Sequence, residues 1–170
     1  PETLKYIYDK AKDSGVEVHQ TACITKGMKG SELCDYDELK NAGASALSDD
    51  GRPVENAELM REALELSNEN GLIITSHCED LSIINGGIMN KGIISEKLGV
   101  KGMDRASENI VTAREILLAE SVGARIHIAH VSTAESVEII RHAKKNGIRV
   151  TCETCPHYFM LTDEKLLARD

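Results

Sequence analysis

The feature that most restricts the fold of this chain is the regular alternation of short apolar segments with amphipathic ones. Apolar runs rich in β-branched residues predict strands, whereas apolar residues that recur every three or four positions predict helices packed on one face. In the clearest helix, Met60 and Leu64 share a face, and Gly71 ends it. The predicted strands cover residues 16–24, 44–48, 72–78, 125–131 and 148–153, and the predicted helices cover residues 3–14, 36–42, 54–70, 105–122 and 133–146.

This alternation predicts an α/β fold with parallel strands covered by helices. Two architectures satisfy it, an open doubly wound sheet and part of an eight-stranded βα barrel, and the periodicity does not separate them. No repeat or linker interrupts residues 1–170, so we treat them as a single domain. The glycine-rich stretch 85–104 is expected to be a long loop. The chain begins at Pro1, directly inside what looks like a helix, and stops at Asp170, in the first turns of a further helical stretch, so we expect both ends to be cuts within a longer protein.

The charge and the cysteines restrict the class of function. A formal net charge of −8 argues against a protein that binds nucleic acid or an anionic membrane, since both select clustered Lys and Arg. No apolar run approaches the ~20 residues that span a bilayer, and no basic segment followed by an apolar one marks a secretion signal. Five cysteines, an odd number, fit reduced thiols better than a disulfide framework. We therefore expect a cytoplasmic protein that binds neither nucleic acid nor membrane.

Chemically useful side chains follow three of the predicted strands. Asp49 and Asp50 follow strand 44–48, while His77 and His130 lie at the ends of the next two predicted strands. In parallel βα folds these strand ends share one rim, where working residues collect. A single histidine there is more often structural, and Asp-Asp-Gly is a common turn. Their coincidence at successive strand ends favours a metal site, because imidazole and carboxylate together suit a divalent ion.

The remaining histidines are weaker candidates. His127 lies three positions before His130, so we expect it on the opposite face of its strand, packed among helices. His142 is expected on a solvated helix face, His19 is ambiguous, and His157 is expected near the rim.

The closely spaced cysteines Cys152 and Cys155 have the spacing of a redox motif or of half a zinc ribbon. A structural zinc site needs a second pair, which the sequence lacks, and a thioredoxin-like pair would stand at a helix N-terminus rather than within a strand. A structural role is therefore favoured.

Four sequence blocks carry a resemblance to a known family. They are ASALSDDGRPV at 44–54, IITSHCED at 73–80, IHIAHVSTAESVEIIRHAK at 126–144 and VTCETCPHYFMLTDE at 150–164. In this order and spacing they resemble the class I dihydroorotases of the amidohydrolase superfamily, and ITKGMKGSEL at 24–33 resembles the same family. A lone HCED would be weak evidence, whereas blocks that span essentially the whole chain are specific.

The resemblance implies a partial (β/α)8 TIM-like barrel of the metallo-dependent hydrolase type, in which the predicted strands are barrel strands three to seven. It implies the reversible cyclisation of N-carbamoyl-L-aspartate to L-dihydroorotate in de novo pyrimidine synthesis, by hydroxide activated on one or two zinc ions. Residue by residue, Asp50 resembles the carboxylate that bridges the metals, His77 the fifth-strand ligand and His130 the sixth-strand ligand.

Parts of the family pattern are missing from the chain. No HxH motif precedes residue 19, and the last-strand Asp that acts as general base is expected outside the chain, so we assign no catalytic or substrate-binding residue. Two alternatives stay open. One is another cyclic amidohydrolase, of allantoinase or dihydropyrimidinase type, against which SDDG in place of a lysine-bearing strand end argues. The other is a non-catalytic partner of aspartate transcarbamoylase. The expected partners are the small-molecule substrate, aspartate transcarbamoylase and a second copy in a homodimer.

Overall fold

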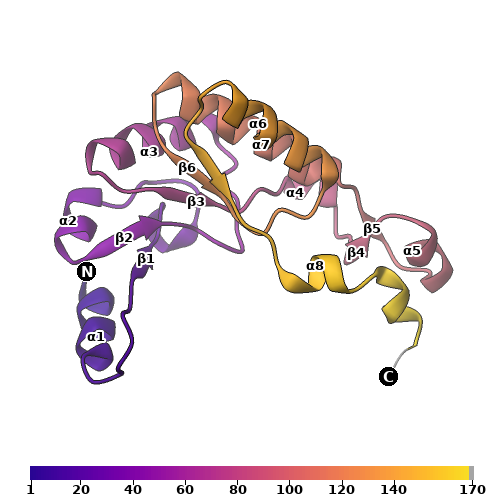
Figure 1. The fold of residues 1–170 in the computed structure, drawn as a ribbon, viewed down its shortest axis with the longest axis horizontal. Helices are drawn as coiled ribbons and strands as arrows, with labels where there is room; N and C mark the ends of the chain where they lie inside the picture. The colour runs from indigo at the N-terminus through magenta and orange to yellow at the C-terminus, as the bar shows by residue number, and fades with distance from the viewer. Residues whose placement is uncertain (169–170) are drawn as a thin grey trace.

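The computed structural model describes residues 1–168, in which five parallel strands form an arc (Figure 1). The strands are β1 (Gln20–Ala22), β2 (Ala44–Leu47), β3 (Ile74–Ser76), β6 (Ile126–Ile128) and β7 (Val150–Cys152). Their order in the sheet is β1-β2-β3-β6-β7, and every neighbouring pair is parallel. Because the order follows the chain without a reversal, the sheet is a section of a barrel wall, whereas a doubly wound sheet reverses its order.

Helices connect these strands, and α3, α6 and α7 lie along the convex side of the sheet (Figure 1). The connecting helices are α2 (Tyr36–Asn41), α3 (Ala57–Glu69), α6 (Ala106–Ser121) and α7 (Ala134–Lys145). Side-chain caps define where three of them begin: Asp35 caps α2, Asn56 accepts the first free N–H groups of α3, and Thr133 accepts the N–H of Ser136 in α7. The alternation seen in the sequence therefore produces the expected βα units.

The hydrophobic core lies between the sheet and these helices. Ile74, Ile126 and Ile128 of the strands are fully buried there together with Leu64 of α3. Alternate strand residues lie in register on the other face of the sheet. The prediction that His127 packs among helices is wrong, because Ile126 and Ile128 take the helix-facing positions. His127 Nδ1 instead lies 2.8 Å from the Thr151 hydroxyl on the neighbouring strand.

The stretch predicted as a long loop contains regular structure, so that prediction is wrong. It holds β4 (Met89–Asn90), α5 (Ile93–Leu98) and β5 (Gly102–Met103), preceded by α4 (Leu81–Ile84), and β4 and β5 form a separate parallel pair. Gly102 is required there, since a Cβ at this position would lie 2.3 Å from the Cα of Lys91. Gly87 and Gly102 therefore reflect close packing of backbones rather than an irregular loop.

The remaining elements stand at the two ends of the sheet. They are α1 (Glu2–Ala11), the 3-10 turn η1 (Lys26–Met28), α8 (Pro156–Met160) and the 3-10 helix η2 (Asp163–Leu167). Asp170, where the sequence predicts a further helical stretch, lies outside the described residues. Within the described part of the chain, no helix combines the length and the apolar character needed to cross a membrane.

Candidate metal centre

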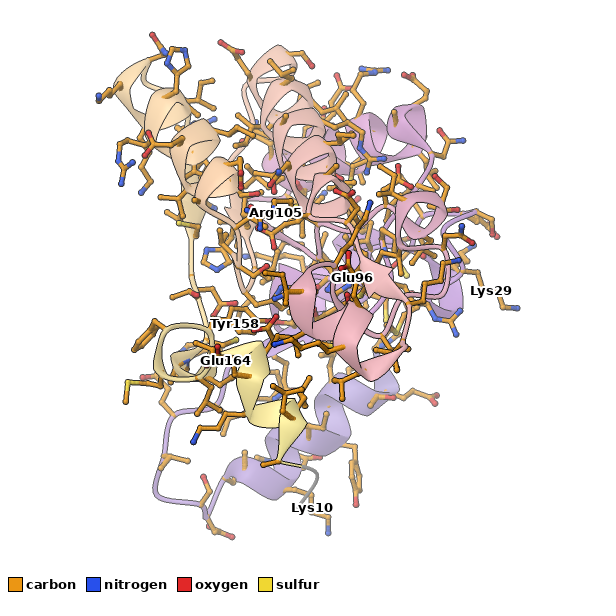
Figure 2. The ribbon with its side chains drawn as sticks, turned by 90° about the vertical axis from the view of Figure 1, so that its right-hand side faces the viewer. Lys10, Lys29, Glu96, Arg105, Tyr158 and Glu164 are labelled. Atoms are coloured by element: carbon orange, nitrogen blue, oxygen red, sulfur yellow. The ribbon has the colours of Figure 1, made fainter. Side chains whose placement is uncertain are left out.

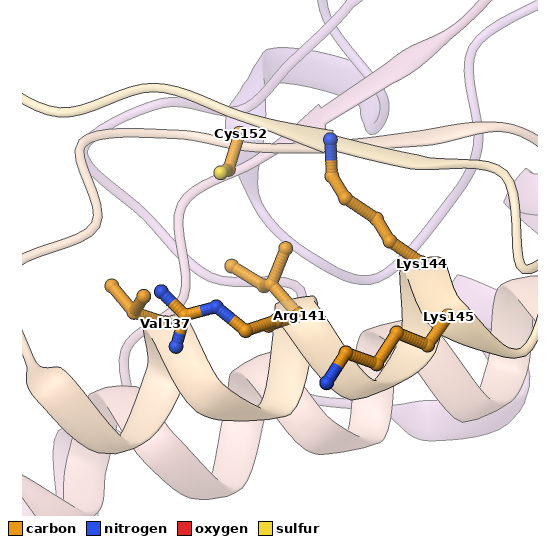
Figure 3. Close-up of a pocket in the computed structure, with 6 residues that line it drawn as sticks. Val137, Arg141, Lys144, Lys145 and Cys152 are labelled. Atoms are coloured by element: carbon orange, nitrogen blue, oxygen red, sulfur yellow. The ribbon is translucent and has the colours of Figure 1, made fainter.

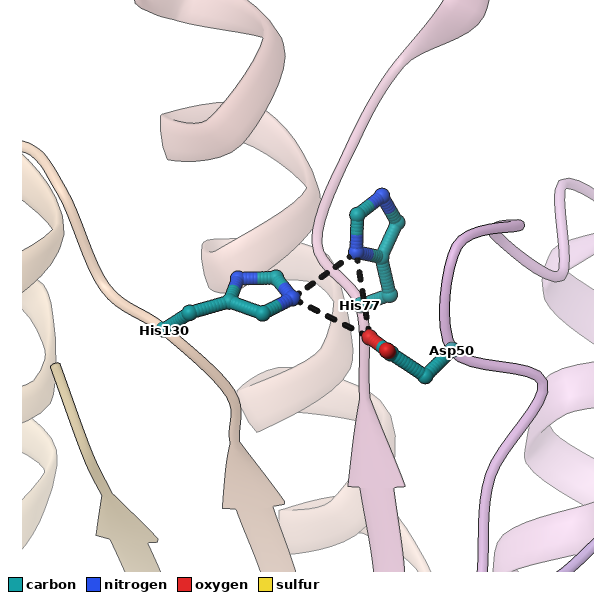
Figure 4. Close-up of side chains that lie close together, drawn as sticks. All are labelled: Asp50, His77 and His130. Atoms are coloured by element: carbon teal, nitrogen blue, oxygen red, sulfur yellow. Dashed lines mark hydrogen bonds and ion pairs between the residues drawn. The ribbon is translucent and has the colours of Figure 1, made fainter. Parts of the chain in front are cut away.

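Neighbouring strands bring Asp50, His77 and His130 to one rim of the sheet (Figure 4). The three side chains follow β2, β3 and β6, which are adjacent in the sheet. His77 Nδ1 lies 2.9 Å from His130 Nε2 and 3.4 Å from Asp50 Oδ1. The third side of this triangle, between His130 Nε2 and Asp50 Oδ1, measures 3.1 Å.

This triangle has nearly the size of one face of a tetrahedral zinc site. Zinc binds imidazole nitrogen and carboxylate oxygen at about 2.0–2.2 Å, so two such ligands stand about 3.3–3.6 Å apart. The observed separations of 2.9–3.4 Å are slightly shorter, and a cation at the centre needs only a small outward movement of the ligands. Both histidines are half-buried, whereas the Asp50 side chain is 63% exposed. The group can therefore hold a cation with an open coordination position on the solvent side.

Glu79 fixes the orientation of His77. Its Oε2 lies 3.2 Å from His77 Nε2, and because a carboxylate only accepts hydrogen bonds, this ring nitrogen carries the proton. His77 Nδ1 then presents a lone pair to the centre, and His130 Nε2 donates towards it or towards Asp50. A carboxylate behind a histidine in this way is the usual support of a metal-binding imidazole.

The two histidines also keep Asp50 ionised. Partial burial raises the pKa of Asp50, but the hydrogen bond from His130 and the closeness of both imidazoles outweigh it, so the pKa lies below its ordinary value. The ionised form is the one that binds a cation.

Asp49, the other member of the acidic pair, has a structural role. It is buried, and its carboxylate accepts the N–H groups of Ile24 and Thr25 and the Thr25 hydroxyl. These bonds tie the segment after β1 to the end of β2. Asp49 therefore fixes the backbone from which Asp50 reaches the histidines.

A cavity of about 370 Å³ opens beside the centre. The residues that line it include His77 and His130 together with Asn90, Arg105 and Tyr158. Arg105 and Tyr158 lie on the same side of the molecule (Figure 2). The volume is in the range of sites for small molecules, so His77 and His130 face a space that can hold one.

The other sequence candidates lie away from the triangle. His142 is exposed on α7, His19 is close to Glu17 and Ser45, and His157 lines a neighbouring cavity with Arg105 and Tyr158.

The cysteines are also separate from the centre. All five are free, and Cys152 lines a depression of about 410 Å³ between α7 and β7 with Arg141, Lys144 and Lys145 (Figure 3). None of the triangle residues lines this depression.

Sequence reasoning missed the supporting carboxylates. Glu79 contacts His77, and Glu108 and Glu153 contact the turn at residues 130–133. The spacing of His77 and Glu79, two positions apart on one strand end, is a signal that could have found Glu79. Glu108 and Glu153 have no such local signal, because they approach the turn from distant parts of the chain.

Comparison with protein-family models shows to which family the chain belongs. The model of the Dihydro-orotase-like family matches residues 2–136. The chain belongs to this dihydro-orotase-like family. Its relatives include the dihydroorotase of Acetivibrio thermocellus, 55% identical over 162 residues, and that of Citrifermentans bemidjiense, 54% identical over 160 residues. These alignments cover 95% and 94% of the chain but 38% of each relative, so the chain spans well under half of their length.

Solved structures extend the likeness to the fold. A D-hydantoinase structure covers 98% of the chain with a TM-score of 0.73 at 21% identity, and the L-hydantoinase (dihydropyrimidinase) of Arthrobacter aurescens covers 95% with a TM-score of 0.69 at 22% identity. The chain covers 38% of each. The resemblance to dihydroorotases and the partial barrel fold are thereby confirmed for this dihydro-orotase-like chain.

Proposed function

We propose that this chain is the metal-holding central part of a dihydroorotase, which interconverts N-carbamoyl-L-aspartate and L-dihydroorotate. The observation that carries the proposal is the triangle of Asp50, His77 and His130 at the rim of a dihydro-orotase-like chain. Relatives at 50–55% identity are named dihydroorotase, which supports dihydroorotate as the substrate rather than the substrates of other cyclic amidohydrolases.

Zinc is the metal that we propose for this centre. When bound, zinc lowers the pKa of water and polarises a carbonyl group, which together allow attack on an amide at neutral pH. His77, held by Glu79, and His130 supply neutral nitrogen ligands, which favour zinc over harder cations. A carboxylate offers two oxygens, so Asp50 is the ligand that could join two cations. The adjoining cavity, which His77 and His130 line, is where the ring amide would bind beside these two histidines. We assign no proton-transferring group to residues 1–168.

A chimera tests this proposal. The chain replaces the matching segment of the Acetivibrio thermocellus dihydroorotase, with which it shares 55% identity. We expect the purified chimera to contain zinc and to hydrolyse dihydroorotate, and we expect His130→Ala to abolish the activity and lower the zinc content. His142→Ala, on the exposed face of α7, is the matched control and should be fully active.

Three results would contradict the proposal. They are a folded chimera without dihydroorotate hydrolysis, normal turnover in the His130→Ala chimera, and a preference for hydantoin or allantoin over dihydroorotate. The last result would instead favour the other cyclic amidohydrolases.

We further propose that the protein acts in the cytoplasm, as a homodimer, in contact with aspartate transcarbamoylase. These points rest on the family resemblance. Light scattering on the complete protein, alone and mixed with aspartate transcarbamoylase, tests both associations, and a monomer that does not change in mass on mixing would contradict them.

A further inference from the structure

The turn that carries His130 has an unusual backbone. His130 has a φ of 37°, in the left-handed region that residues with a Cβ rarely adopt, because the Cβ crowds the neighbouring carbonyl. Glycine, which avoids this crowding, is the common choice for such a position. A histidine there requires surrounding contacts that hold the conformation.

The left-handed turn decides where the imidazole lies. Residues of β6 alternate between the two faces of the sheet, and Ile126 and Ile128 are buried on the helix side. An extended backbone would continue this alternation and direct position 130 to the helix side as well. The turn at His130 breaks the alternation, and the imidazole lies instead beside Asp50 and His77.

Glu153, immediately after β7, forms three hydrogen bonds with the end of β6 and the turn that follows it. Its N–H donates to the Ile128 carbonyl at 3.2 Å, and its own carbonyl accepts the Val131 N–H at 2.8 Å. Its side chain Oε1 accepts the N–H of His130 itself at 2.9 Å. The first two bonds use the backbone of residue 153 and can form with any residue except proline, whereas the third requires a side-chain acceptor of this length.

A second carboxylate holds the far end of the same turn. Glu108 of α6 accepts the Ser132 N–H at 3.1 Å and the Thr133 N–H at 3.2 Å, and it also accepts the hydroxyl groups of both residues. Residues 130–133 therefore lie between two acceptors, one from α6 and one from the end of β7. Glu108 fixes the start of α7, and Glu153 acts on His130 directly.

We propose that Glu153 is a positioning residue of the metal centre, whose side-chain hydrogen bond to the His130 N–H holds the left-handed turn that aims this imidazole at Asp50 and His77. The inference rests on the proposed function only in taking these three residues as the metal ligands. In this proposal Glu153 acts by the hydrogen bond that holds the His130 backbone, and not by the attraction between its negative charge and the cation.

Zinc titration of the full chain against a competing chromophoric chelator tests this proposal. Glu153→Ala should raise the zinc Kd about 10–100-fold, the range expected when the support of a metal-binding imidazole is lost. Glu153→Gln keeps an acceptor of the same length without the charge and should stay close to the parent Kd. Glu153→Asp keeps the charge but withdraws the carboxylate by one methylene, and should bind as weakly as the alanine variant. Glu138→Ala, which removes an exposed carboxylate paired with Arg141, is the control and should not change the Kd.

Hydrogen exchange of backbone amides separates local loosening from unfolding. In chain treated with EDTA, Glu153→Ala should speed exchange at the His130 amide, while the amides of Ile126 and Ile128 keep the parent rate. If Glu153→Ala does not fold, the aspartate and glutamine variants carry the same comparison.

The outcomes distinguish this inference from the proposed function. Parent-like zinc binding by folded Glu153→Ala or Glu153→Asp would overturn the positioning role. A glutamine variant as weak as the alanine variant would also overturn it, because charge rather than the hydrogen bond would then act. A parent chain that does not bind zinc would overturn the proposed function and this inference together, whereas unchanged Kd values in the variants would overturn this inference alone.

Discussion

Glu115 offers a quantitative test of the core, because it is a carboxylic acid buried among apolar side chains. It is 1% exposed on α6, and one of its oxygens pairs with Arg114. Its Oε2, like Arg114 Nε, is buried without a hydrogen-bond partner among the described residues. Burial raises the pKa of Glu115 from 4.5 to about 7, although Arg114 acts in the opposite direction.

The sign of the effect on stability follows from the proton balance. Between pH 4.5 and about pH 7, the carboxyl group is ionised in the unfolded chain and protonated in the folded chain. Unfolding then releases a proton, so the contribution of Glu115 to the free energy of unfolding is fully present below pH 4.5 and is lost as the pH rises through 7. At about 1.36 kcal/mol for each pH unit, the loss amounts to about 3 kcal/mol.

Glu115→Gln removes this titration and leaves a side chain of similar size. We expect the variant to be more stable than the parent by up to about 3 kcal/mol at pH 8 and to differ little at pH 4. Urea denaturation followed by circular dichroism at both values measures the difference, and comparing variant with parent cancels the other titrating groups. Glu120→Gln, exposed on the same helix, is the control and should show no such pH dependence. A Glu115→Gln variant that is less stable than the parent at pH 8 would refute the reasoning.

Three further predictions concern the centre and its scaffold. Asp49→Ala leaves the N–H groups of Ile24 and Thr25 without their acceptor and should lower the free energy of unfolding by about 2–4 kcal/mol in urea denaturation; a neutral effect would contradict the structural role of Asp49. Glu79→Ala frees His77 Nε2 and should raise the zinc Kd about 10–100-fold in chelator competition, and an unchanged Kd would show that Glu79 does not orient the ring. Ile74→Ala should cost about 2–5 kcal/mol, whereas Leu117→Ala, at a side chain 62% exposed, should change stability by less than about 0.5 kcal/mol; equal effects in urea denaturation would contradict the assigned core.

The secondary structure could be predicted because each main element buries one face, so its apolar residues recur at the spacing of a helix or a strand. The observed strands are shorter than predicted: β1, for example, covers Gln20–Ala22 within the predicted 16–24. The arrangement of the strands could not be predicted from periodicity, because a barrel wall and a doubly wound sheet share the same alternation. β4 and β5 were missed because two-residue strands are too short to show a period.

The convergence of Asp50, His77 and His130 could be predicted from the rule that parallel strands end at one rim. The sequence could not show that Asp49 binds the backbone while Asp50 lies beside the histidines. Two adjacent acidic residues look alike until their tertiary contacts are known. The face of His127 was predicted wrongly because the sequence does not show which face of the strand carries the helices. The contact between Glu153 and His130 was missed because it depends on the turn at His130. Nothing in the sequence indicates that His130 has a φ of 37°, whereas a glycine at this position would have suggested the turn.

The position of zinc in crystals of the chain, located by anomalous scattering at the zinc absorption edge, tests the metal centre most directly. We predict a peak about 2.0–2.2 Å from His77 Nδ1, His130 Nε2 and Asp50 Oδ1. A zinc peak elsewhere, such as at Cys152 and Cys155, with none between these three atoms would contradict the account.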